Sequence, residues 1–166
     1  MIIKITNYAE GIHEFDFSEP VEKVGLGTPF CGDLKLNVRM DRSHSQIVFM
    51  CDVFVNAELN CDRCARTFKR EFKNSFVITY IIQNNPAVSE DLNVYYISPE
   101  TDKVNLKEDV REYVLLAVPM KNLCEEDCKG LCPRCGKNLN EEACGCTSDE
   151  VNPVWAELLK LRKIED

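Results

Sequence analysis

The feature that most constrains this chain is a long segment with almost nothing apolar to bury. Residues 121–149 hold six cysteines, but their only aliphatic side chains are Leu123, Leu131, Leu139 and Ala143. So polar a segment gains too little from the hydrophobic effect to offset the entropy lost when its backbone is ordered. It needs another source of stability, and the spacing of its cysteines indicates a bound metal.

Eight of the ten cysteines fall into four close pairs. Two are C-x2-C pairs, Cys61–Cys64 and Cys132–Cys135; three residues separate Cys124 from Cys128, and Cys144–Cys146 is a C-x-C pair. Structural zinc takes four tetrahedral ligands, and a C-x2-C turn places two sulfurs on one ion. In a reducing compartment, clustered cysteines are more typical of metal ligands than of disulfides.

We predict two structural four-cysteine zinc sites. One is formed by Cys132, Cys135, Cys144 and Cys146. Its ligands close a short local loop, so the chain-entropy cost is small. The other is formed by Cys61, Cys64, Cys124 and Cys128 and joins distant parts of the chain. Its alternatives are two free thiol pairs, or a pairing in which Cys128 joins the C-terminal ligands.

Two further cysteines and both histidines are not expected to bind metal. Cys31 and Cys51 stand alone, and Cys51 shares the apolar parity of its segment, which is typical of a small buried hydrophobe. Neither His13 nor His44 is near a cysteine pair in sequence.

The first two-thirds of the chain alternates between apolar and polar residues. This period of two predicts strands with one buried face at Leu34–Met40, Ile47–Leu59 and Phe68–Tyr80. Weaker patterns predict strands at Ile2–Ile5, His13–Phe17 and Val94–Ile97. The polar segment Asp41–Gln46 is expected to be a hairpin loop, and Asn84–Asp91 a surface loop.

Two helices are expected. Leu106–Val118 has helical spacing, with Asn105 as N-cap, Glu108 as its capping-box partner and Pro119 ending the helix. A last helix starts at Asn152-Pro153. We therefore predict an α+β fold: an antiparallel, possibly barrel-like sheet with two helices and a C-terminal zinc-binding lobe. A β-rich domain over 1–120 would end in a helix, and the cysteine-rich lobe would take 121–166.

Charge and composition limit the function. A formal net charge of −8 and a pI near 4.9 argue against coating nucleic acid and favour a basic partner. Two zinc ions, each with four thiolates, would deepen the charge to −12. No apolar run approaches the roughly 20 residues of a membrane helix, and Met1–Glu10 lacks a signal-peptide core, so we expect a cytoplasmic protein with no membrane partner.

The sequence contains no catalytic motif that we can identify. The thiols can close both metal sites, whereas catalytic zinc keeps an open position, so we expect no enzyme and no small-molecule substrate. A basic cluster near the first cysteine pair is one candidate for a local RNA contact. We favour the other interpretation, in which the basic residues form a solvated strand face and the phenylalanines form a buried row on the opposite face. The cluster is Arg63, Arg66, Lys69, Arg70 and Lys73, interleaved with Phe68 and Phe72. The acidic run Glu125–Asp127 is expected to be a solvated turn.

The cysteine block also resembles a known family. Cys124–Asn140 reads C-E-E-D-C-K-G-L-C-P-R-C-G-K-N-L-N and is followed by C-G-C at Cys144–Cys146. Together with Cys61–Cys64 and the Asn152-Pro153 helix, it resembles the YceD family of large ribosomal RNA subunit accumulation proteins, over residues 45–163. Spacing alone indicates only a zinc-stabilised, acidic, β-rich protein.

The resemblance implies a bacterial or plastid protein needed for large-subunit ribosomal RNA to be processed or to accumulate. It implies no catalytic residue. The expected partner is a basic ribosomal protein, precursor ribosomal RNA of the large subunit, or both. Two alternatives remain: a zinc-stabilised adaptor that binds a basic protein outside translation, and a thiol redox sensor.

Overall fold

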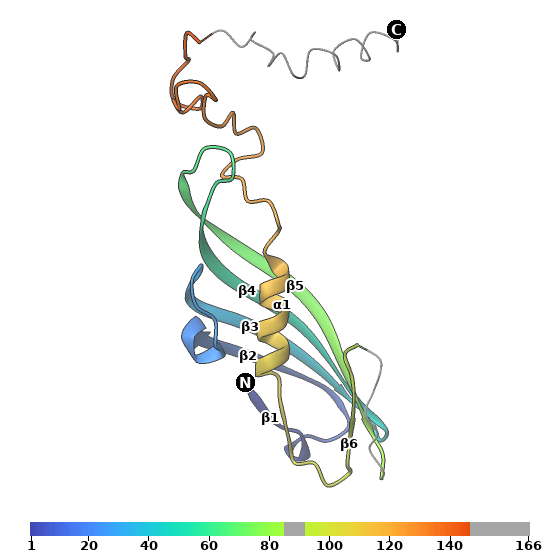
Figure 1. Ribbon diagram of the computed structural model, residues 1–166. Helices are drawn as coiled ribbons and strands as arrows, with labels where there is room; N and C mark the ends of the chain where they lie inside the picture. Colours follow the sequence, from blue (N-terminus) through green and yellow to red (C-terminus); the bar gives the residue numbers. More distant parts are fainter. Residues whose placement is uncertain (85–91, 147–166) are drawn as a thin grey trace, which may run out of the picture.

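The computed structural model describes residues 1–84 and 92–146 (Figure 1). Its main element is a five-stranded sheet in the order β2-β3-β4-β5-β6. The strands are β2 (Gly11–Pro20), β3 (Phe30–Arg42), β4 (Gln46–Asn60), β5 (Thr67–Ile82) and β6 (Val94–Ile97). Strands β2 to β5 form a meander whose antiparallel pairing was predicted, whereas β6 pairs with β5 in parallel.

Smaller elements complete the described chain. Strand β1 (Ile2–Lys4) pairs antiparallel with β7 (Lys103–Asn105) in a separate two-stranded sheet. Two short 3₁₀ helices, η1 (Ile5–Asn7) and η2 (Val21–Val24), flank β2, and α1 spans Lys107–Ala117. In the described part of the chain, no helix is long and apolar enough to cross a membrane.

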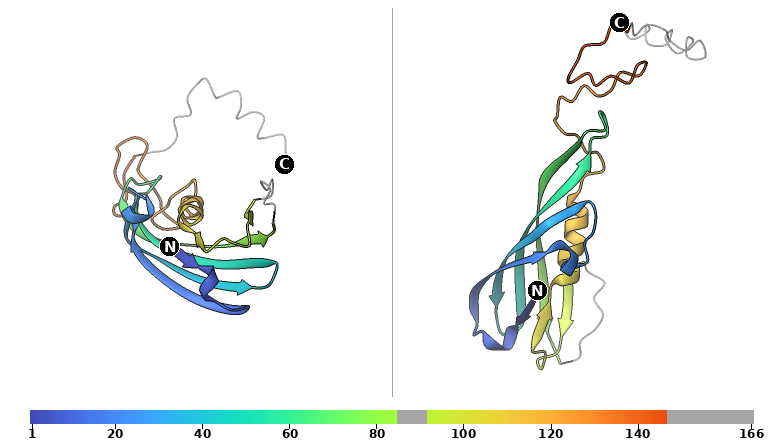
Figure 2. Two further views of the ribbon diagram at one scale, coloured as in Figure 1. Left: turned by 90° about the horizontal axis from the view of Figure 1, so that it is seen from below. Right: turned by 90° about the vertical axis from the view of Figure 1, so that its left-hand side faces the viewer.

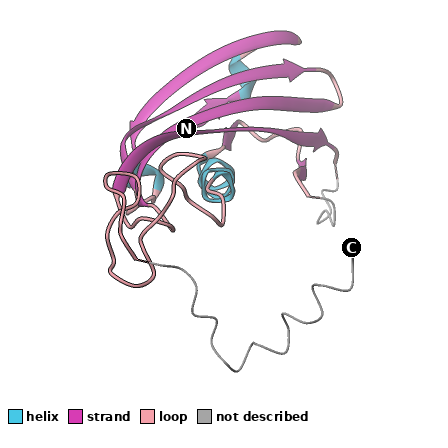
Figure 3. Cartoon of the chain, turned by 90° about the horizontal axis from the view of Figure 1, so that it is seen from above, coloured by secondary structure: helices cyan, strands magenta, loops and turns pink. Residues whose placement is uncertain are grey.

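The large sheet is curved but open, so it is not a closed barrel. Strands β2 and β6 lie at opposite edges of the sheet and are not paired with each other. Figures 2 and 3 show α1 lying on the concave side of the sheet. In a closed barrel the strands would enclose this apolar face themselves. Here α1 covers it instead.

Alternation along the strands explains the core. Inward-facing residues of β3 and β4, from Leu34 through Met40 and from Ile47 through Ala57, are almost completely buried, while most of their neighbours are exposed. Helix α1 adds Val110 and Val114 to the same core. The Tyr113 ring stacks on the Phe76 ring of β5, with centroids 4.1 Å apart.

Helix α1 confirms the predicted helix but not its predicted cap. Its N-cap residue is Leu106, with no side-chain cap hydrogen bond, because Asn105 still belongs to β7 and pairs with Ile2. The Asn105 side chain instead accepts a hydrogen bond from the backbone N–H of Lys107 (3.1 Å).

The β4–β5 hairpin carries the first cysteine pair. It is built from the two longest strands, and Cys61 and Cys64 lie at its tip. After α1 the chain runs to this tip and continues beyond it (Figure 1). The predicted helix at Asn152-Pro153 and most of the predicted loop Asn84–Asp91 lie outside the described residues. The domain boundary between 120 and 121 remains a prediction.

Candidate metal centres

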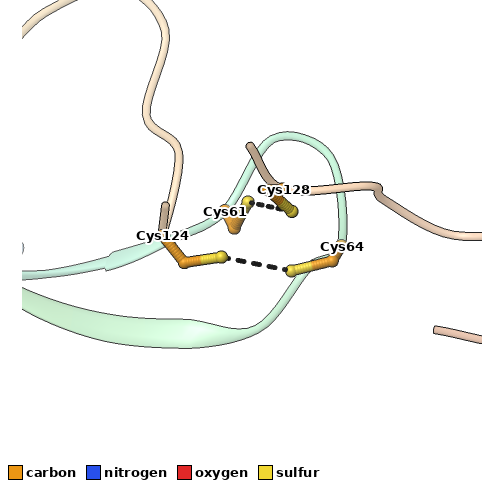
Figure 4. Close-up of side chains that lie close together, drawn as sticks. All are labelled: Cys61, Cys64, Cys124 and Cys128. Carbon is orange, nitrogen blue, oxygen red and sulfur yellow. Dashed lines mark hydrogen bonds between the residues drawn. The ribbon is translucent and has the colours of Figure 1, made fainter. Parts of the chain in front are cut away.

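A tight turn at the hairpin tip positions the first C-x2-C pair. The backbone N–H of Cys61 donates to the Arg66 carbonyl oxygen (2.9 Å), and the N–H of Ala65 donates to the Cys61 carbonyl oxygen (2.9 Å). To close this turn, Ala65 adopts a left-handed conformation with φ of 57°. Figure 4 shows the Cys61 and Cys64 side chains from this turn beside those of Cys124 and Cys128.

The first four cysteines form a compact group. The sulfur of Cys61 lies 3.7 Å from that of Cys128, and the sulfur of Cys64 lies 3.7 Å from that of Cys124 (Figure 4). All four Sγ atoms lie within 4.8 Å of one another. Sulfurs bound at 2.3 Å to a tetrahedral ion lie about 3.8 Å apart, so these four can hold a metal ion.

The second group repeats the turn of the first. The N–H of Cys132 donates to the Lys137 carbonyl oxygen (2.8 Å), and that of Gly136 donates to the Cys132 carbonyl oxygen (2.9 Å). Gly136 occupies the left-handed position, with φ of 73°. Four sulfurs again lie within 4.8 Å of one another, and this group too can hold a metal ion: Cys132, Cys135, Cys144 and Cys146.

The structure therefore brings together the same two sets of four cysteines that the sequence predicted. It does not place Cys128 with the C-terminal ligands, the alternative that the sequence left open. Cys51 is buried, and burial raises its pKa to about 12, in line with a small buried hydrophobe. Cys31, His13 and His44 belong to neither group.

Polar contacts hold the segment that carries Cys124 and Cys128 against the hairpin tip. The Arg70 guanidinium donates to the Leu123 carbonyl oxygen (2.6 Å), and the Arg63 guanidinium donates to the Cys128 carbonyl oxygen (2.8 Å). These contacts fix the backbone at both ends of the segment that carries Cys124 and Cys128.

A reciprocal pair of hydrogen bonds extends this contact. The Asp62 N–H donates to the Asn122 carbonyl oxygen (2.8 Å), and the Asn122 N–H donates to an Asp62 carboxylate oxygen (2.6 Å). Arg66 forms an ion pair with Glu125 (3.2 Å), so part of the acidic run contacts the hairpin rather than solvent alone. The two chain segments are thus joined by backbone and side-chain contacts as well as by cysteines.

The basic cluster is engaged within the protein. Lys69 lies 3.5 Å from Glu58, and Lys73 lies 4.0 Å from Asp52, each across the β4–β5 pair. The three arginines of the cluster make the contacts described above, and Phe72 is buried beneath the strand. Arg66, Lys69 and Lys73 still keep more than half of their side-chain surface exposed, as expected of a solvated strand face.

The two groups differ in exposure. Three of the four cysteines in the first group are buried, with Cys124 half-buried, whereas Cys135 and Cys146 of the second group are exposed. Among the described residues, the first site is therefore more shielded from solvent than the second, in which only Cys132 is buried.

Local hydrogen bonds and like charges separate the thiol pKa values within each group. Burial by itself would raise the pKa of Cys61, but backbone N–H groups, including that of Cys124, lower it to about 6. Backbone N–H groups of Cys135 and Arg134 lower the pKa of Cys132 to about 6. Burial raises the pKa of Cys124 to about 12, and the Cys135 thiol does the same for Cys146. A bound dication would favour the thiolate form of all four ligands.

Sequence reasoning missed the residues that connect the two groups. The Asn140 side chain, from the loop of the second group, donates a hydrogen bond to the sulfur of Cys128 in the first (3.4 Å). Nothing in the sequence singled out Asn140 as a contact to the sulfur of a cysteine in the other group.

Fold and site together define an α+β protein with a curved sheet, a covering helix and two four-cysteine groups that can each hold a metal ion, one at the β4–β5 hairpin tip and one in the segment that follows. The sequence model of one family, described as large ribosomal RNA subunit accumulation protein YceD, matches residues 50–162. The chain belongs to the YceD family.

Individual relatives are similar over different lengths. The chloroplast protein of Arabidopsis thaliana named large ribosomal RNA subunit accumulation protein YCED homolog 1 is 31% identical over 41% of this chain and 21% of its own length. The Bacillus subtilis protein YlbN is 27% identical over 92% of this chain and 90% of its own. The Mycobacterium bovis protein Mb2951c is 25% identical over 77% of this chain and 61% of its own. No solved structure matches significantly.

Proposed function

We propose that this protein is a non-enzymatic, zinc-binding factor that acts in the cytoplasm in processing or accumulation of large-subunit ribosomal RNA and in ribosome assembly. The observation that carries the proposal is membership of a family named for large ribosomal RNA subunit accumulation. The Arabidopsis relative carries the same description in its name.

Zinc is the metal that best fits the donor sets. Tetrahedral sites of four thiolates are typical of structural zinc or of iron–sulfur centres, and the sulfur spacing of 3.7 Å is close to that expected around a single zinc ion. Bound zinc would supply folding energy to a polar segment that lacks its own core. With four thiolates each, both sites would be closed, which supports a structural role and not a catalytic one.

The partner is a basic ribosomal protein, precursor ribosomal RNA, or both. A net charge of −8 favours a positively charged surface, and Arg63, Arg66 and Arg70 are engaged by acceptors within the protein. We therefore favour a protein contact as the main one. The same charge supports the second candidate, an adaptor that binds a basic protein outside translation.

Depletion and sedimentation test the proposal. Cells depleted of the protein should accumulate less large-subunit ribosomal RNA or more of its precursors, and the protein should co-sediment with large-subunit precursors. Cys132→Ser combined with Cys135→Ser should fail to restore RNA levels, whereas Cys31→Ser, outside both groups, should restore them. Unchanged ribosomal RNA after depletion would refute the ribosomal role.

Nuclease treatment separates the two candidate partners. If ribosomal RNA is the direct partner, digestion should release the protein from its complexes. If a basic protein is the partner, the complex should survive digestion and dissociate with rising salt. A stable complex with a basic protein unrelated to ribosomes would favour the adaptor instead.

A further inference from the structure

We infer that the two metal sites bind metal cooperatively, and that Asn140 is the positioning residue that links them. The inference rests on the metal binding proposed above and adds a physical link between the sites. The link runs from the loop of the second group to a ligand of the first.

The Asn140 side chain bridges the two groups with its orientation fixed. Its Oδ1 accepts a hydrogen bond from the backbone N–H of Lys129 (2.7 Å), which directs its Nδ2 toward the first group. Nδ2 donates to the Cys128 sulfur (3.4 Å) and also to Asn138 Oδ1 (2.8 Å). Cys128 is buried, with 2% of its surface exposed, so this donor sits beside a shielded sulfur.

A second link between the two cysteine groups is the close approach of the Gly130 backbone to the Arg63 carbonyl group. The Leu131 N–H donates to the Arg63 carbonyl oxygen (3.2 Å), and the Leu139 N–H donates to the Gly130 carbonyl oxygen (2.9 Å). Gly130 has φ of 79°, and a Cβ there would lie 3.1 Å from the Arg63 carbonyl oxygen. The linker between the groups thus rests directly on the turn that carries Cys61 and Cys64.

The Asn140 contact depends on the second site. Asn140 lies between Cys135 and Cys144, so metal bound to these ligands closes the loop that presents its side chain. A donor to a metal-bound thiolate orients the ligand and stabilises its charge, and loss of such a donor typically lowers metal affinity about 10- to 100-fold. Occupancy of the second site therefore raises affinity at the first, and by linkage the reverse also holds.

Cysteine protection measures each site separately. The zinc-loaded full chain is titrated with a chelator, released thiols are alkylated, and mass spectrometry reads the label at each cysteine. Asn140→Ala should lower the chelator concentration that exposes Cys61 and Cys128 about 10-fold, the lower end of the usual range. Asn140→Asp should have at least this effect, because it keeps the acceptor for Lys129 but loses the N–H donor.

Two comparisons isolate the link from a general loss of structure. Glu142→Gln removes an ion pair with Lys137 in the same loop without touching the first group, and should leave Cys61 protection unchanged. Cys144→Ser with Cys146→Ser should expose the first site as much as Asn140→Ala does, and adding Asn140→Ala to it should have no further effect.

The possible outcomes also separate the inference from the proposed metal binding. Equal labelling of all eight cysteines with and without zinc would refute metal binding, and the inference with it. Zinc protection at both sites that is unchanged by Asn140→Ala and Asn140→Asp would refute the link alone. A first site that keeps its affinity after the second is removed would do the same.

Discussion

Exchanging the residue at the left-handed position of each turn tests whether the two cysteine turns are equivalent. Ala65 and Gly136 occupy the same position, with φ of 57° and 73°, but only the second is a glycine. A left-handed conformation costs an L-residue about 1–2 kcal/mol, whereas glycine adopts it freely. Ala65→Gly should therefore favour the first turn, and Gly136→Ala should disfavour the second.

The expected size follows from the local geometry. Glycine in place of Ala65 also increases the entropy of the unordered chain by about 0.5–1 kcal/mol, which leaves a net gain of roughly 0.5–1 kcal/mol. A Cβ on Gly136 would meet nothing within 4 Å, so Gly136→Ala adds no steric clash. Its left-handed backbone cost, less the same entropy term, leaves a net loss of roughly 0.5–1 kcal/mol. Such changes correspond to roughly 2- to 5-fold in metal affinity.

Chelator competition on each variant supplies the measurement. Ala65→Gly should raise the chelator concentration that exposes Cys61, and Gly136→Ala should lower the concentration that exposes Cys132. Gly27→Ala serves as the matched control, since a Cβ there meets nothing within 4 Å and Gly27 has no positive φ. If Ala65→Gly weakened metal binding, the left-handed conformation of Ala65 would not be a source of strain in the first turn.

Four further predictions concern the rest of the chain. Chelation should speed amide hydrogen exchange in 121–146 while the sheet stays protected, because the sheet has its own core; uniform exchange would contradict it. Phe49→Ala should cost about 3–5 kcal/mol in denaturant unfolding, since Phe49 is fully buried, and a loss below 1 kcal/mol would count against that packing. Arg70→Ala should weaken metal binding at the first site a few-fold by removing its hydrogen bond to Leu123, and an unchanged affinity would exclude that role. Cys51 should resist alkylation in the folded protein at pH 8, because its pKa of about 12 keeps it a thiol; rapid labelling would show that it is not buried.

Local patterns predicted most of the fold. Alternation located β3, β4 and β5 because each has one face toward the core, and helical spacing located α1 to within a residue at each end. The parallel pairing of β6 with β5 was not predictable from these patterns, since strand direction depends on contacts distant in sequence. The open edge of the sheet was equally hidden, because alternation is the same in an open sheet and a barrel.

The cysteine sets were predictable for a different reason. The eight clustered cysteines form four close pairs, and a tetrahedral site takes two pairs. Only a few ways of combining the pairs into two sites therefore exist. The contacts around those ligands were not predictable: Asn140 and Cys128 are 12 residues apart, and Arg70 reaches Leu123 across 53. Both contacts depend on how the folded chain brings these residues together, which residue spacing alone does not show.

Metal content of the purified, reduced protein tests the central claim most directly. The two four-cysteine groups predict two zinc ions per chain by elemental analysis, falling to one when Cys132 and Cys135 are both replaced by serine. A chain without bound metal whose residues 121–146 still resist hydrogen exchange would contradict the account, because that polar segment would then be ordered by something other than its cysteines.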